Sequence, residues 1–212
     1  MKTYSAKEIF YTLQGEGANA GRAAVFCRFS GCNLWSGLEK DRASAVCQFC
    51  DTDFVGVDGL GGGKFKSAEA MAEAIDGYWP QTSSGTKLVV CTGGEPLLQL
   101  DKNLIECLHE KGFEIAVETN GTIKAPEGID WLCVSPKANS EIVQTSGHEL
   151  KLVFPQEENT PEDFLDFKFD HFFLQPKDDL NQAHNIQATI DYIHRHPQWR
   201  LSLQTHKITG IR

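Results

Sequence analysis

The stretch KLVVCTGGEP, residues 87–96, contains the pattern that decides the fold. Its first six residues form a short run rich in Val and Leu, typical of a strand buried on both faces, and two glycines and a glutamate follow. Short apolar runs that stop at polar residues, Gly or Pro indicate strands. Six further runs have this character: AAVFCRF (23–29), FEIAVET (113–119), IDWLCVS (129–135), HELKLVF (148–154), HFFLQP (171–176) and RLSLQTH (200–206).

Helical signals lie between several of these strands. Ser67 can cap a helix over AEAMAEAIDGYW (68–79), and Thr160 followed by Pro161 is a second start signal. Isoleucines at 186, 190 and 193 share one face of a further helix that a proline at 197 would end. The region 120–148 shows no clear crossover helix.

The alternation of strands and helices predicts an α/β fold with a mostly parallel sheet. A complete eight-unit barrel typically needs about 250 residues. The chain has 212, so we expect an incomplete TIM-like barrel of the (β/α)6 type, in a single domain that covers residues 1–212.

Composition excludes several classes of function. Apolar residues make up 41% and charged residues 23%, and no apolar run approaches the roughly 18 residues of a membrane span. The N-terminus lacks the layout of a signal peptide, so we expect a cytoplasmic protein without a membrane partner. The formal net charge of -9 argues against binding to nucleic-acid phosphates and favours a small substrate.

Polar residues follow the expected strands at their carboxyl ends. Glu95 follows one strand, Asn120, Ser135 and Gln175 lie at the ends of others, and His206 lies at the end of the last. In a parallel barrel these ends converge on the face where active sites are built. Gly93 and Gly94 permit close approach of a ligand or simply form a tight turn, and Glu95 could hold an ammonium group.

Three cysteines point to a metal site. Cys47 and Cys50 have the C-x2-C spacing at which two thiolates reach one centre, and Cys32 lies fourteen residues before Cys47. Structural zinc needs four ligands, whereas three thiolates on a four-iron cluster leave one iron open for an exogenous ligand. We expect the other four cysteines to be buried structural residues: Cys27, Cys91, Cys107 and Cys133.

Arg28 has two possible partners. It alternates with Cys27 and Phe29, so it points to the opposite side of its strand and into the barrel. A substrate carboxylate would satisfy the buried guanidinium, and so would a salt bridge to Glu16 or Glu118.

The chain resembles the 7-carboxy-7-deazaguanine synthase family of the radical S-adenosylmethionine (SAM) superfamily, which belongs to the queuosine and deazapurine pathway. Most of the superfamily has a C-x3-C-x2-C cluster motif, and the C-x14-C-x2-C spacing here is similar to that of some members of this family. The stretches that carry the resemblance extend over nearly the whole chain: EIFYTLQGEG (8–17), VFCRFSGCNLW (25–35), CQFCDTDF (47–54), CTGGEP (91–96), ETNG (118–121), VSPK (134–137), QP (175–176) and QTHK (204–207).

The resemblance implies a site residue by residue. Cys32, Cys47 and Cys50 would hold a [4Fe-4S] cluster, and SAM would bind to Gly94, Glu95, Ser135, Pro136 and Lys137. Thr52 would bind Mg²⁺, although Asp51 and Asp53 are more obvious candidates by charge. The substrate, 6-carboxy-5,6,7,8-tetrahydropterin, would contact Leu13, Gln14, Gly15, Glu16, Arg28, Thr92, Gln175, Pro176, Lys177, Asp178 and His206.

The implied activity is that of a carbon–nitrogen lyase with no catalytic group beyond the cluster and SAM. An electron from flavodoxin or ferredoxin would cleave SAM to methionine and a 5′-deoxyadenosyl radical, which takes a hydrogen atom from C6 of the pterin. The ring then contracts, ammonia leaves to give 7-carboxy-7-deazaguanine, and SAM is regenerated. The family also implies a homodimer.

Two other classes stay open at this point. A radical SAM activase would need a wide docking face for a protein partner, against which the small-molecule set Gln14, Glu16, Arg28 and His206 argues. A zinc-binding interaction module would contain zinc and no sulfide.

We further expect the excursion 34–46 to tolerate substitution, except for Trp35, which could pack against the cluster. The tail after His206 should either cap the pocket or fray.

Overall fold

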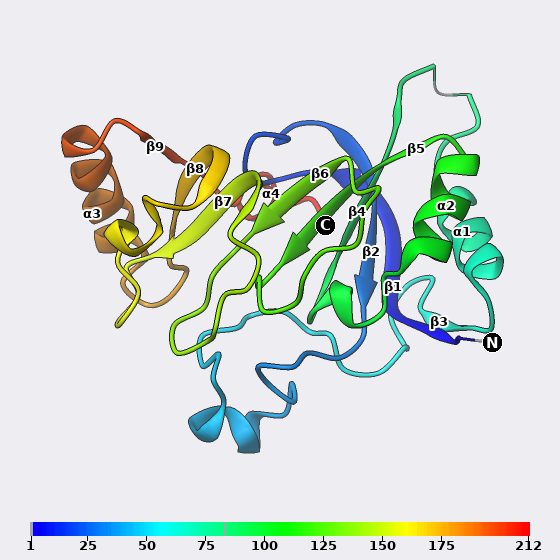
Figure 1. The fold of residues 1–212 in the computed structure, drawn as a ribbon, viewed down its shortest axis with the longest axis horizontal. Helices are drawn as coiled ribbons and strands as arrows, with labels where there is room; N and C mark the ends of the chain where they lie inside the picture. Colours follow the sequence, from blue (N-terminus) through cyan, green and yellow to red (C-terminus); the bar gives the residue numbers. More distant parts are fainter. Residues whose placement is uncertain (1, 83) are drawn as a thin grey trace.

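A single mixed sheet forms the centre of the computed structural model, which describes residues 2–82 and 84–212. The strand order is β3-β1-β2-β4-β5-β6-β7-β8-β9 (Figure 1). The strands are β1 (Tyr4–Leu13), β2 (Ala23–Phe29), β3 (Gly63–Phe65), β4 (Lys87–Gly93), β5 (Phe113–Thr119), β6 (Trp131–Val134), β7 (Ser146–Phe154), β8 (Lys168–Pro176) and β9 (Trp199–Leu201).

Short helices connect or flank the strands. The α-helices are α1 (Ala68–Asp76), α2 (Lys102–Glu110), α3 (Gln182–Arg195) and α4 (Thr205–Thr209). Three segments are 3-10 helices: η1 (Glu39–Ser44), η2 (Pro96–Leu98) and η3 (Pro161–Phe164). Within the described ranges no helix is long and apolar enough to cross a membrane.

The sheet is an open, partly curled barrel. From β2 to β9 every neighbouring pair is parallel, whereas β1 runs antiparallel to both β2 and β3. The outermost strands β3 and β9 do not pair with each other. The expected incomplete barrel is therefore confirmed, in the form of an open sheet.

The crossovers differ along the sheet. In the described chain α1, α2 and α3 cover the β2–β4, β4–β5 and β8–β9 connections, and no helix lies between β5 and β7. The sequence correctly indicated no crossover helix in 120–148. Residues 120–130 and 135–145 of the described chain therefore join parallel neighbours as loops.

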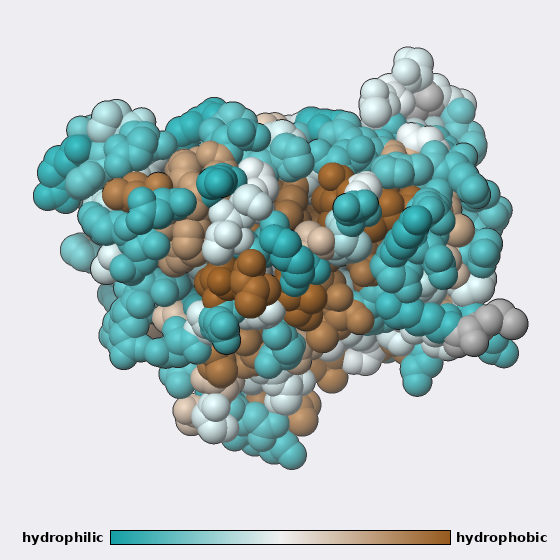
Figure 2. Space-filling view, in the orientation of Figure 1, coloured by the Kyte–Doolittle hydropathy of each residue, from teal (hydrophilic) through white to brown (hydrophobic). Residues whose placement is uncertain are grey.

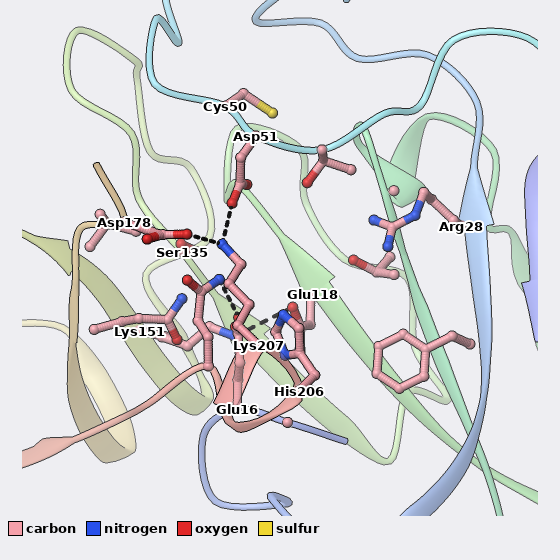
Figure 3. Close-up of a pocket in the computed structure, with 18 of the residues that line it drawn as sticks. Glu16, Arg28, Cys50, Asp51, Glu118, Ser135, Lys151, Asp178, His206 and Lys207 are labelled. Atoms are coloured by element: carbon pink, nitrogen blue, oxygen red, sulfur yellow. Dashed lines mark hydrogen bonds and ion pairs between the residues drawn. The ribbon is translucent and has the colours of Figure 1, made fainter. Parts of the chain in front are cut away.

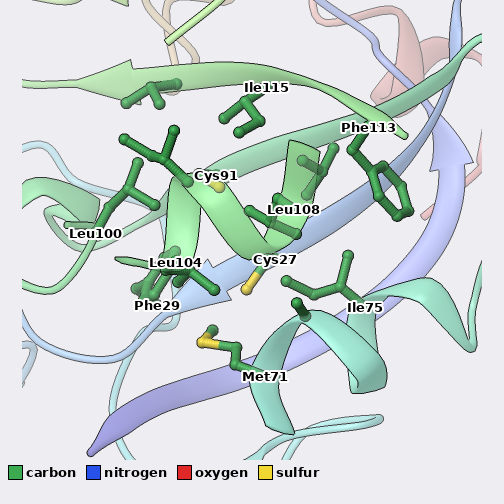
Figure 4. Close-up of a cluster of buried hydrophobic side chains, with 14 of the residues drawn as sticks. Cys27, Phe29, Met71, Ile75, Cys91, Leu100, Leu104, Leu108, Phe113 and Ile115 are labelled. Atoms are coloured by element: carbon green, nitrogen blue, oxygen red, sulfur yellow. The ribbon is translucent and has the colours of Figure 1, made fainter. Parts of the chain in front are cut away.

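The main core lies between the sheet and the pair α1 and α2 (Figure 4). Met71 and Ile75 of α1 and Leu104 and Leu108 of α2 are buried against it. The expected structural role of the other cysteines is confirmed: three are fully buried, and Cys107 is partly buried against the same core. A smaller cluster under α3 contains Leu150, Leu152, Phe164, Leu174 and Trp199.

The opposite side of the sheet carries the site. Alternate residues of the same strands, Ala24, Leu88, Val90 and Ala116, form a thin apolar floor there. In the view of Figure 2, hydrophilic residues occupy most of the periphery, and apolar residues gather near the centre.

Local structure departs from the sequence-based expectations at several points. Residues 4–13 form the longest described strand, which the sequence reading missed because this antiparallel strand is only partly apolar. The run expected over 200–206 is a strand only to Leu201, and 205–209 form α4. The start signal at Thr160 and Pro161 opens only the single turn η3, since Phe164 and Phe167 then fold into the small core under α3.

We predict that Leu108→Ala lowers the free energy of unfolding by about 2–5 kcal/mol, because it opens a cavity in the core between the sheet and α2. Urea unfolding followed by circular dichroism measures the change. Leu60→Ala is the matched control, because Leu60 is 52% exposed and its truncation should cost no more than about 0.5 kcal/mol. Equal losses in the two variants would show that the core is not where we place it.

Candidate active site

A pocket of about 400 Å³ opens where the parallel strands end, a volume typical of small-molecule sites (Figure 3). It brings together all the residues expected to contact substrate: Leu13, Gln14, Gly15, Glu16, Arg28, Thr92, Gln175, Pro176, Lys177, Asp178 and His206. Cys50, Thr52, Gly94, Ser135 and Lys137 line the same pocket. The remaining expected residues, Cys32, Cys47, Glu95 and Pro136, do not lie on its wall.

A close contact between β4 and β2 places the cysteine loop. The amide of Gly94 donates to the carbonyl of Phe29 at 3.3 Å, and the amide of Glu95 donates to that of Gly31 at 2.9 Å. A side chain at position 94 would put its Cβ 2.1 Å from the Gly31 oxygen and 2.9 Å from Cβ of Cys32. Only glycine allows this approach, so Gly94 fixes where the loop begins.

Glu95 is fully buried and ties three segments together. Its carboxylate accepts hydrogen bonds from the Leu97 amide (2.9 Å), the Thr119 hydroxyl (2.8 Å) and the Asn120 amide (2.8 Å). Burial raises the pKa of Glu95 despite these donors. The sequence reading gave Glu95 only a ligand role, whereas its carboxylate also holds the ends of β4 and β5 in register.

The three loop cysteines are free thiols, and Cys50 lines the pocket. A hydrogen bond between Cys47 and Cys50 lowers the pKa of Cys50 to about 6. The Leu34 amide donates to Sγ of Cys32 at 3.4 Å. In the described residues no three potential ligands converge on one point as a single ion requires, whereas a four-iron cluster binds each thiolate at a different iron. The donor set fits such a cluster.

The excursion between Cys32 and Cys47 contributes a side chain that the sequence reading missed. Arg42 donates from Nη1 to the carbonyls of Gln48 and Cys50, both at 3.0 Å. Its guanidinium carbon lies 4.1 Å from the ring centre of Trp35, which is buried edge-on against Phe54. The expectation of a tolerant excursion therefore does not extend to Arg42, whose hydrogen bonds hold the C-x2-C turn.

The candidate magnesium ligands differ in their pairing. The carboxylate of Asp51 pairs with Lys207 at 2.8 Å, and that of Asp53 pairs with Lys7 at 2.9 Å. Thr52 lies between them and lines the pocket, and no side-chain hydrogen bond occupies its hydroxyl within the described structure. The two carboxylate candidates are thus already paired with lysines, which favours Thr52 as the magnesium ligand.

Arg28 enters the pocket as expected, with a different ion-pair partner. Its Nε donates to Glu8 of β1 at 2.9 Å, so neither of the two expected carboxylates, Glu16 and Glu118, pairs with it. Glu8 also accepts from Arg212 at 2.6 Å. The sequence could not place Glu8 opposite Arg28, because β1 had not been recognised as its neighbour strand.

A buried lysine and two glutamates form the opposite wall. Nζ of Lys151 lies 2.5 Å from Glu16 and 3.3 Å from Glu118. Burial alone would raise the pKa of Glu16, but Lys151 and hydrogen bonds outweigh it and lower the pKa to about 2. The sequence reading missed Lys151, although a lysine within the apolar run HELKLVF was a visible signal.

The C-terminal residues lie across the pocket. The amide and hydroxyl of Thr205 both donate to the carbonyl of Gly15, at 3.0 and 2.9 Å. Lys207 joins Asp51 to Asp178, and the Thr12 hydroxyl donates to the carbonyl of Arg212 at 2.8 Å. The expectation that the tail caps the pocket agrees with these contacts.

An open α/β sheet with a three-cysteine loop at the carboxyl ends of its strands defines the class of radical SAM enzymes. The fold is that of a solved structure named QueE from Escherichia coli, with a TM-score of 0.69 and 24% identity over 95% of this chain and 93% of that one. No protein-family model matches the chain.

Two curated relatives are similar over their whole length. A 7-carboxy-7-deazaguanine synthase of Caulobacter vibrioides is 63% identical over 99% of each chain. Another of Burkholderia multivorans is 59% identical over 99% of each chain. The chain belongs to the 7-carboxy-7-deazaguanine synthase family, whose members are radical SAM enzymes with a [4Fe-4S] cluster.

We predict that Arg42→Met weakens cluster retention by roughly 10–100-fold, as is usual when a residue that orients metal ligands is lost. Iron and acid-labile sulfide per chain after a chelator challenge measure this. Lys40→Met removes one positive charge from the same excursion at an exposed position and should retain its cluster. Equal cluster retention in both variants would show that the excursion tolerates substitution at Arg42 as well.

Proposed function

We propose that this chain converts 6-carboxy-5,6,7,8-tetrahydropterin to 7-carboxy-7-deazaguanine with loss of ammonia, in the biosynthesis of the queuosine precursor. The observation that carries the proposal is the composition of one pocket. Every residue expected at the substrate lines it, together with Cys50 of the cluster loop. Distant segments of the chain supply these residues, so their convergence is a property of the fold.

Cys32, Cys47 and Cys50 would hold the cluster, and Cys50 lines the pocket. When bound, the cluster and SAM would supply the abstraction of a hydrogen atom from the substrate. Gly94 and Ser135 reach the wall and would contact SAM with Glu95 and Pro136 behind them. Nζ of Lys137 donates to the carbonyl and to the hydroxyl of Ser135, both at 2.7 Å. These hydrogen bonds hold the turn in one conformation.

The charges on the two walls orient the pterin. Arg28 would bind the substrate carboxylate, because its single strong partner, Glu8, is shared with Arg212. Gln14 and Glu16 on the opposite wall offer acceptors to the amino and amide edge of the ring. Thr52, which lines the pocket, would be a ligand of Mg²⁺, since a hard ion prefers oxygen ligands.

The residues that cover the pocket exclude water. Phe10 and Phe26 stack at 5.6 Å on its apolar side, and Arg212 covers Phe10. The tail closes the opposite side through Lys207. Such enclosure suits a small substrate and argues against an activase that must admit a protein segment.

We further propose a homodimer that works in the cytoplasm with flavodoxin or ferredoxin as electron donor. Each protomer would be a single domain over residues 1–212. An open sheet with two free edges supports the dimer, since such edges are normally covered.

The deciding experiment uses anaerobically reconstituted, reduced protein with SAM, Mg²⁺ and 6-carboxytetrahydropterin. Chromatography with mass detection should show 7-carboxy-7-deazaguanine. Formation of 5′-deoxyadenosine without that product would retain the radical chemistry and reject the substrate. Neither compound, with iron and sulfide fully loaded, would reject the proposal.

We predict that Arg28→Met lowers kcat/KM by about 10–100-fold, mostly through KM, because a hydrogen bond between charged groups contributes roughly 1.5–3 kcal/mol. Steady-state kinetics on the pterin measure it. Arg22→Met also breaks an arginine–glutamate pair, with Glu114 away from the pocket, and should leave KM unchanged. A KM for Arg28→Met equal to that of Arg22→Met would exclude contact between Arg28 and the substrate.

A further inference from the structure

The buried ammonium of Lys151 joins two carboxylates that come from different parts of the fold. Lys151 lies on β7, Glu118 on β5 and Glu16 in the connection after β1. The lysine side chain is only 4% exposed, and all three residues line the pocket (Figure 3). A lysine this deep is rare unless it is paired, so its position depends on both glutamates.

Each glutamate is held at both of its oxygens. The second oxygen of Glu16 accepts from the side-chain amide of Gln204 at 2.9 Å. The second oxygen of Glu118 accepts from the side-chain amide of Gln14 at 2.8 Å. A carboxylate oxygen can accept two hydrogen bonds, so each group is fixed in orientation and still has capacity for a ligand.

The wall carries more negative than positive charge. Burial would lower the pKa of Lys151, but the glutamates raise it well above its usual value, so it stays charged. Two carboxyl groups against one ammonium favour a ligand edge made of N–H donors. The other titratable groups that face Lys151 and Glu16 are Cys133 on β6, Glu149 on β7 and His206 on α4.

We infer that Lys151 is a positioning residue that fixes Glu16 and Glu118 as paired acceptors, and that this pair selects a ligand with an exocyclic amine beside a ring N–H. The identity of that ligand rests on the proposed function. The 2-amino-4-oxo edge of a pterin presents this row of donors. A lumazine replaces the amine with a carbonyl, whose oxygen would face the carboxylates.

Equilibrium dialysis with two unreactive aromatic probes, 6-carboxypterin and 6-carboxylumazine, tests the inference on the anaerobic protein loaded with cluster and SAM. Wild-type protein should bind the pterin at least about 100-fold more tightly, because the lumazine leaves buried acceptors unpaired. Lys151→Met should lose most of this preference, whereas Lys151→Arg keeps the charge and should restore part of it. Lys87→Met is the matched control, since Lys87 is a half-buried strand lysine paired with Asp76 outside the pocket.

The pH dependence separates positioning from general destabilisation. In the wild type, the pKa of Glu16 near 2 keeps it ionised, so pterin binding should be nearly flat between about pH 5 and 7.5. Without Lys151 burial raises the pKa of Glu16, so this carboxyl is protonated at the acid end and regains its full acceptor character as pH rises. Affinity of Lys151→Met for the pterin should therefore increase with pH.

The outcomes are distinguishable. Wild-type protein that binds neither probe, or binds the lumazine equally well, would overturn the inference together with the proposed substrate. A wild type that prefers the pterin, with a Lys151→Met variant that keeps the same preference and a flat profile, would overturn the inference alone. If Lys151→Met fails to fold, Glu118→Gln replaces it, and full retention of the preference in that variant would contradict the acceptor pair.

Discussion

The contact between the Gly94 turn and the start of the cysteine loop is the constraint on which the site depends. A parallel sheet brings the strand ends to one edge, but it does not fix how the loops that follow these ends are positioned relative to one another. Here the amides of Gly94 and Glu95 bind the carbonyls of Phe29 and Gly31, and the absence of a side chain at Gly94 lets Cβ of Cys32 lie directly above. The buried carboxylate of Glu95 extends this connection to β5. One turn thus fixes the first thiol relative to the pocket wall.

Around this fixed point, ion pairs set the shape of the pocket walls. A small apolar cluster of Ala24, Leu88, Val90 and Ala116 lies on this side of the sheet, whereas the larger core lies on the other face under α1 and α2. The walls consist of ion pairs such as Arg28 with Glu8 and Lys151 with Glu16, whose partners come from distant segments. Ion pairs of this kind contribute little net stability but penalise any other arrangement, so they define a shape.

The sequence predicted those parts of the molecule that follow from local pattern. Strands β2, β4 and β5 begin and end within a residue of the expected positions, because a strand buried on both faces leaves an uninterrupted apolar run. The members of the pocket were predicted through the resemblance of their motifs, and they do converge. The prediction of ion-pair partners failed. The partner of Arg28 is Glu8, and only the antiparallel register of β1 places these two residues opposite each other. Lys151 and Arg42 were missed for the same reason, since the importance of a charged side chain depends on which groups the fold places opposite it.

The openness of the sheet and the position of the C-terminal residues are connected. A closed barrel would surround its ligand with strands on every side, whereas here β3 and β9 stay apart and leave a gap in the wall. Residues 205–212 lie at this gap, bonded to Gly15 on one side and to Asp51 and Asp178 on the other. Asp51 directly follows Cys50 of the cluster loop, and Asp178 lies among the expected substrate residues. Lys207 therefore joins the cluster loop to the substrate wall, so that the segment that closes the barrel also holds its two functional halves together.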